Sequence, residues 1–92
     1  MLHLSELIAT AETQANGMKP FVFLGVEHPC HKPSALLLVA EAKAMWTNGA
    51  SDSAVALTLA RSLEYSAGVG SRLHRQFLDH ADCFAAMDAV YN

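Results

Sequence analysis

The chain has 92 residues, of which 52% are hydrophobic and only 16% charged, and its formal net charge is −3. A chain of this length makes one small domain, and we expect residues 1–92 to form a single globular unit. The mildly acidic balance argues against broad binding to nucleic acid or to an anionic membrane, which a basic surface favours, but it leaves room for a local basic patch. Soluble chains usually carry about 25% charged residues, so we infer that a second chain covers part of the apolar surface, most simply in a homodimer.

The two cysteines, Cys30 and Cys83, can make at most one disulfide. The opening residues MLHLSEL lack the basic start and the apolar stretch of a secretory signal. We therefore expect a cytoplasmic protein with reduced thiols. No apolar run reaches the roughly 20 residues that a membrane-spanning helix needs, so no membrane partner is expected.

The N-terminal third predicts a helix followed by a strand. A helix is expected over residues 5–16, with Ser5 as a plausible N-cap and Asn16-Gly17 as a strong stop signal. Its apolar residues fall at helical spacing: Leu4, Leu7, Ile8, Ala11 and Ala15. The run FVFLGV at residues 21–26 has the composition of a β-strand, and residues 27–34 predict a loop. A lone strand needs a partner. Residues 1–4, the same strand of a second subunit, or a strand of a target protein could each supply it.

The run ALLLVAEAKAMW at residues 35–46 is apolar on nearly every side of a helix. Such a helix is normally buried, so we expect it to be the centre of the core, capped by Ser34, with Leu37 and Leu38 fully packed. A third helix should be capped by Ser51, Asp52 or Ser53, and a fourth, capped by Ser71, should run over residues 72–90. The expected fold is α+β and mostly helical: about four helices around a buried central helix, with one short β-strand, in the order α-β-α-α-α.

A basic cluster lies at the start of the fourth helix. Arg72, His74 and Arg75 fall in its first turn, after the glycines of residues 68–70, and Arg61 lies one helix earlier. Helix N-termini attract anions, so these four residues are the candidate site for an anion or an acidic partner. The alternative is that the arginines are solvated or reach Glu64 and Asp79, which is the commoner fate of surface charges.

Four other side chains are candidate metal ligands. His28 and Cys30 lie in the predicted loop, and His80 and Cys83 lie three residues apart in the last helix, as in a Cys2His2 zinc site. The spacing fits no zinc-finger pattern, and free cysteine is usually a small core residue, so we expect no metal and no other cofactor. Cys30 or Cys83 beside a histidine could act as a nucleophile, but no catalytic motif supports this, and we expect no enzyme.

Residues 59–73 faintly resemble a helix-turn-helix motif, with Ala60 at the close helix contact. The resemblance departs at Glu64, where the turn glycine belongs, and at Gly70, where the second helix needs a buried aliphatic residue. The favoured interpretation is therefore a small non-enzymatic protein-binding module, a regulator or inhibitor that docks on a partner protein. By analogy of size class alone, it could be encoded by a phage or mobile element. A DNA-binding regulator and a zinc-stabilised domain are the second and third alternatives.

Overall fold

The computed structural model describes residues 3–30 and 32–91, and for residues 18–21, 23, 27–30 and 91 it describes the backbone alone. The described chain is mostly helical, as predicted, and comprises four helices and a two-stranded hairpin. None of these helices is both long and apolar enough to cross a membrane. In chain order the elements are α1 (Leu4–Asn16), β1 (Met18–Phe23), β2 (Val26–Cys30), α2 (Pro33–Thr47), α3 (Asp52–Ser66) and α4 (Arg72–Tyr91).

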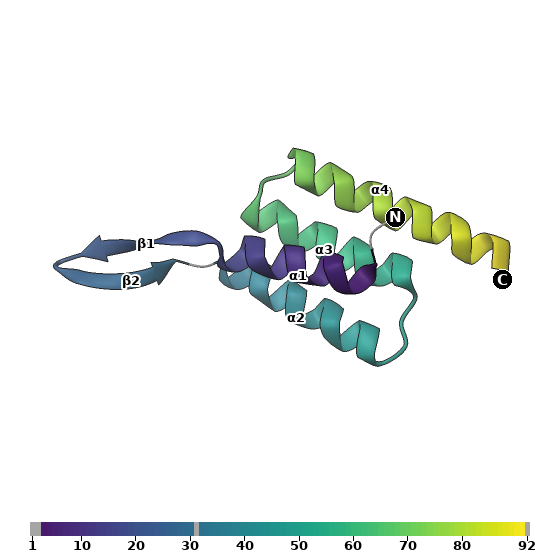
Figure 1. Ribbon diagram of the computed structural model, residues 1–92, viewed down its shortest axis with the longest axis horizontal. Coiled ribbons are helices and arrows are strands. Elements are labelled where there is room, and N and C mark those ends of the chain that lie inside the picture. Colours follow the sequence, from purple (N-terminus) through teal and green to yellow (C-terminus); the bar gives the residue numbers. More distant parts are fainter. Residues whose placement is uncertain (1–2, 31, 92) are drawn as a thin grey trace.

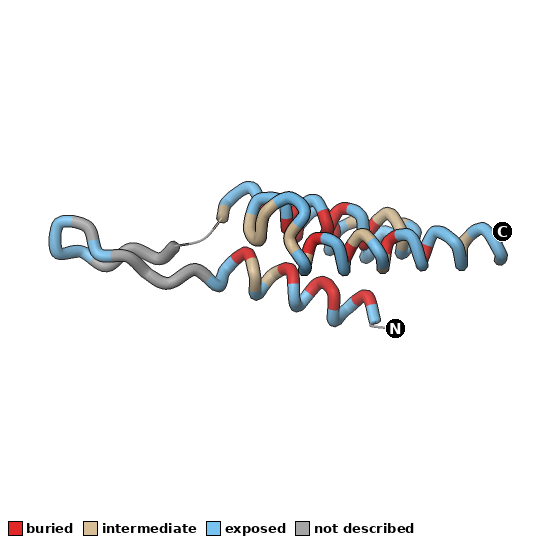
Figure 2. Tube along the Cα trace, turned by 90° about the horizontal axis from the view of Figure 1, so that it is seen from above, coloured by how far each residue is buried: buried red, intermediate tan, exposed pale blue. Residues whose placement is uncertain are grey.

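The four helices form a bundle in which three of them lie side by side. Figure 1 shows α2, α3 and α4 in a row, and α1 running lengthwise over α2 and α3. Seen from above in Figure 2, α1 is displaced to one side of that row. Helix α4 makes its extensive contacts with α3, at the edge of the row. As a result, α3 is enclosed by neighbours while α4 keeps a long outward face.

The centre of the core is α3, and the prediction that residues 35–46 form the central helix was wrong. Helix α3 packs against each of the other three helices, and α2 buries only Ala35, Val39 and Ala42. Leu37, expected in the core, is 73% exposed, and Leu38 is only partly buried. Alanines at the helix contacts let neighbouring backbones approach closely, which suits α3 to the middle position. Its buried residues are Val55, Ala56, Thr58, Leu59, Ala60, Ser62 and Leu63.

The two buried hydroxyls of α3 both bond to carbonyls of their own helix, and that of Thr58 also lies 3.5 Å from Sδ of Met45 in α2. Thr58 donates to the carbonyl of Ala54 at 3.0 Å, and Ser62 donates to the carbonyl of Leu59 at 2.6 Å. Side-chain hydroxyls that bond to the preceding turn can be buried without a partner from another helix. The core is therefore held by apolar packing, completed by Phe77 and Phe84 of α4.

The predicted single strand is one half of an antiparallel hairpin, so the prediction of a lone strand and of a loop over residues 27–34 was wrong. Strand β1 pairs with β2, with Phe23 opposite Val26, and the turn between them is Leu24-Gly25. The strand therefore finds its partner in the next segment of the same chain. The sequence concealed the turn because it contains no Asn-Gly or Asp-Gly, the strongest hairpin signals.

The helix starts differ slightly from the prediction. Helix α1 is preceded by His3 and α2 begins with Pro33, so neither Ser5 nor Ser34 occupies the capping position. Proline suits the first position of a helix because the amide hydrogen that it lacks would have no partner there. The predicted caps of the last two helices are confirmed: Ser51 accepts from the amide of Ala54, and Ser71 accepts from the amide of His74.

Candidate functional site: the hairpin arm

The hairpin of residues 18–30, here called the arm, projects from the end of the bundle where α1 ends and α2 begins (Figure 1). Its extensive contacts are those between its own two strands. The molecule measures 57 × 27 × 17 Å with a radius of gyration of 14.7 Å. A compact domain of this length would have a radius of gyration of about 12 Å. The arm therefore presents its end well away from the core.

The end of the arm carries three apolar side chains in solvent. Val22 is 71% exposed, Leu24 is 87% exposed and Val26 is 58% exposed. We call these three residues the tip. Single exposed apolar residues are ordinary on protein surfaces, but three of them at the end of a projecting element, on both of its faces, indicate a contact surface.

The turn at the tip places a leucine in an unfavourable backbone conformation. Leu24 has φ 52° and Gly25 has φ 77°, which are the paired left-handed residues of a type I′ hairpin turn. Glycine adopts this conformation freely, whereas a residue with a Cβ costs roughly 1–2 kcal/mol there. Among the residues described, Leu24 is the one non-glycine with positive φ. The chain thus maintains a strained and exposed leucine where asparagine would satisfy the turn better.

The base of the arm is fixed to the bundle. The amide of Lys32 donates to the carbonyl of Ala15 at 3.2 Å, which joins the two ends of the arm across the end of α1. Gly17 makes the exit from α1 possible, since a Cβ there would lie 2.8 Å from the carbonyl oxygen of Thr13. The direction of the arm is therefore set by backbone geometry at its base.

The basic residues predicted as an anion or partner site are divided between two environments. Arg61, Arg72 and Arg75 are exposed and form no hydrogen bond or ion pair with any described residue. His74 is only 5% exposed and lies between α4 and the preceding turn. The structure therefore places Arg72 and Arg75 on the outside of the first turn of α4, without His74 beside them.

His74 has a structural role in the turn between α3 and α4. Its Nδ1 accepts a hydrogen bond from the amide of Gly70 at 3.0 Å, so the proton of the neutral ring lies on Nε2. Nε2 lies 3.4 Å from Oε1 of Glu64, but the two atoms do not meet the geometry of a hydrogen bond. We interpret the approach as an electrostatic contact, because a carboxylate favours the positive edge of the ring. His74 therefore holds the turn between α3 and α4.

The candidate metal ligands lie on separate parts of the molecule. His80 and Cys83 are on α4, whereas β2, which carries His28 and Cys30, belongs to the arm (Figure 1). The side chains of His28 and Cys30 are outside what the structure describes. Within the described part, no three histidine, cysteine or acidic side chains gather as metal ligands would.

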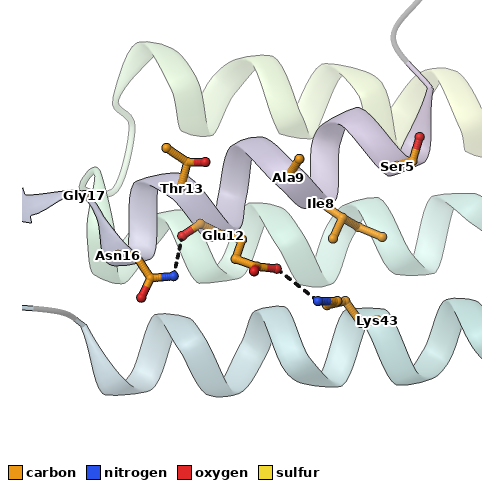
Figure 3. A pocket seen from close by; sticks show the side chains of 8 residues that line it. All are labelled: Ser5, Ile8, Ala9, Glu12, Thr13, Asn16, Gly17 and Lys43. Atoms are coloured by element: carbon orange, nitrogen blue, oxygen red, sulfur yellow. Dashed lines mark hydrogen bonds and ion pairs between the residues drawn. The ribbon is translucent and has the colours of Figure 1, made fainter.

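A groove between α1 and α2 was not predicted from the sequence. Figure 3 shows its lining, in which Glu12 and Lys43 form an ion pair of 3.1 Å across the two helices. The groove has a volume of about 590 Å³ and is largely open to solvent. Both charged side chains are about half exposed, so the pair adds little stability. The other lining residues are Ser5, Ile8, Ala9, Thr13, Asn16 and Gly17.

Comparison with known proteins finds no matching protein family, no matching curated protein and no matching solved structure. The function must therefore be inferred from the chain's own geometry.

Proposed function

We propose that this protein is a small protein-binding module whose docking element is the arm. The observation that carries the proposal is Leu24, which is both the most exposed of the tip residues and held at positive φ. Residues kept in strained conformations cluster at functional sites, where the surroundings or a ligand make use of the strain. The partner is a protein with an apolar pocket wide enough for the turn.

The energetics favour insertion of the tip into such a pocket. Burying one leucine or valine side chain contributes about 1.5–3 kcal/mol relative to leaving it in water. The register places Val22 and Val26 on opposite faces of the hairpin, one on each side of Leu24, so a pocket that receives the whole turn would bury all three side chains. A module that fills a partner's pocket in this way would regulate or inhibit that partner by occupying the pocket.

The geometry of α3 and α4 favours this proposal over DNA binding by a helix-turn-helix. That motif sets two helices at a steep angle around a short turn. Here α3 and α4 run alongside each other in the row, and Glu64 lies inside α3 where the motif needs its turn (Figure 1). A gel-shift assay at low salt tests the alternative directly, and we expect no retarded complex.

Replacing Leu24 with asparagine tests the proposal without disturbing the fold. Asparagine followed by glycine is a preferred type I′ pair, so Leu24→Asn should retain the hairpin while removing the apolar anchor. Leu37→Gln is the matched control, because it removes another leucine exposed to a similar degree, on α2. Immobilised wild type and both variants are used to capture proteins from source cells, and the captured proteins are quantified by mass spectrometry.

A partner that is retained by the wild type and by Leu37→Gln, and lost by Leu24→Asn, would support the arm as the docking element. Circular dichroism should show the same helix content for all three proteins. If Leu24→Asn retained the same proteins in the same amounts as the wild type, the tip would be excluded as the contact site.

A further inference from the structure

The outward face of α4 carries an ordered pattern of charge. Arg72, Arg75, Asp79 and Asp82 follow one another at spacings of three and four residues, so they lie along one stripe of the helix. All four side chains are exposed, and none forms an ion pair or hydrogen bond with a described residue. The stripe is thus basic in its first half and acidic in its second.

Apolar side chains extend both ends of this stripe. Ala86 and Val90 continue it toward the C-terminus, and Val69 precedes it in the turn after α3. All three are exposed, and the two valines are each more than three-quarters exposed. The whole sequence of patches is therefore apolar, basic, acidic and apolar.

When a second copy of α4 is laid against the first in the opposite direction, the basic half of each stripe faces the acidic half of the other, and the apolar ends face each other. We propose that two copies of the chain associate through α4 in an antiparallel, two-fold arrangement. Arg75 then faces Asp79 of the second copy, and Arg72 faces Asp82, with each contact made twice by the symmetry. A parallel pairing would instead set arginine against arginine and aspartate against aspartate, which is repulsive.

The same register brings the apolar ends together. With the two-fold axis at the level of residue 77 along the outward face of α4, Ala86 of one copy lies opposite the turn that carries Val69 of the other. Val90 extends past that turn, beyond the start of α4 of the other copy. The ion pairs are exposed and set the direction of pairing, since such pairs each contribute at most about 1 kcal/mol. The apolar ends supply the burial.

This surface is separate from the arm, so the dimer and the docking of a partner are tested independently. Two variants divide the charges: Arg72→Glu with Arg75→Glu makes the stripe wholly acidic, and Asp79→Arg with Asp82→Arg makes it wholly basic. Light scattering over a hundredfold dilution at low salt measures the mass of each. We expect a concentration-dependent dimer for the wild type, and at least a tenfold weaker dimer for each variant alone.

Two further experiments test whether the helices pair in the antiparallel direction: mixing the acidic and basic variants, and combining all four substitutions in one chain. The acidic and basic variants mixed in equal amounts should form a heterodimer, because every facing pair is then of opposite charge. Combining all four substitutions in one chain should restore the homodimer, because only antiparallel pairing sets positions 72 and 75 against positions 82 and 79. Circular dichroism checks that each variant keeps its helices. A wild type that is monomeric at every concentration, or a fourfold variant that stays monomeric while the wild type dimerises, would overturn the proposal.

Discussion

Ser53 donates a hydrogen bond from its hydroxyl to the carboxylate of Asp88, with Oγ and Oδ2 3.1 Å apart. The contact joins the first turn of α3 to the last full turn of α4. Because the start of a helix carries partial positive charge, the Asp88 carboxylate is also favoured there electrostatically. Helix α4 is thus tied to the bundle nearly to its end, and Val90 lies exposed beyond the tie.

Removing this tie should lower the stability measurably. We expect Asp88→Ala to reduce the free energy of unfolding by about 1 kcal/mol, because it removes a partly buried hydrogen bond to a charged acceptor. Glu41→Ala on the exposed side of α2 is the control and should change it by less than about 0.5 kcal/mol. Urea denaturation measures both. Equal values for the two variants would mean that the contact contributes nothing.

The turn between α3 and α4 should depend on His74. His74→Ala leaves the amide of Gly70 without its acceptor and removes a buried side chain, so we expect a loss of about 2–4 kcal/mol. Hydrogen exchange provides the specific test. The amide of Gly70 should exchange faster in the variant, whereas that of Gly68, which bonds to the carbonyl of Leu63 at 2.9 Å, should change less. Unchanged protection at Gly70 would contradict the assigned bond.

Because α3, and not α2, is the centre of the core, truncating a leucine should have different effects in the two helices. Leu59→Ala should lower the free energy of unfolding by about 2–5 kcal/mol, because Leu59 is fully buried in α3, which packs against the other three helices. Leu37→Ala should cost less than about 0.5 kcal/mol, because Leu37 is exposed. Thermal and urea denaturation of the two variants compare them directly. A larger loss at Leu37 would restore α2 as the centre of the core.

The sequence predicted the helices well because their apolar residues recur at helical spacing. In α1 the buried residues Leu4, Leu7, Ile8, Ala11 and Ala15 are the same stripe that periodicity identified. The same periodicity could not show which helix lies at the centre of the core. A helix that is apolar all round has no stripe to show which side is buried, and Leu37 and Val39 look alike in sequence although only Val39 is buried.

The candidate site was harder to predict for a physical reason. The continuous run of apolar residues and glycine at positions 21–26 predicts one strand, yet the chain turns at Leu24-Gly25 in the middle of it. A leucine at positive φ runs against local preference, and a prediction from preference therefore misses it. The glycine was the one available signal of a turn. The basic cluster was correctly placed at the start of α4, but His74 faces inward because it accepts from Gly70.

The most direct test of the arm as the docking element is photo-crosslinking from its tip. A photoreactive phenylalanine analogue is placed at position 24 in one protein and at position 37 in another, and each is irradiated with the partner present. We predict a covalent adduct with the partner from position 24 and none from position 37. An adduct from position 37 alone, or equal yields from both positions, would contradict it.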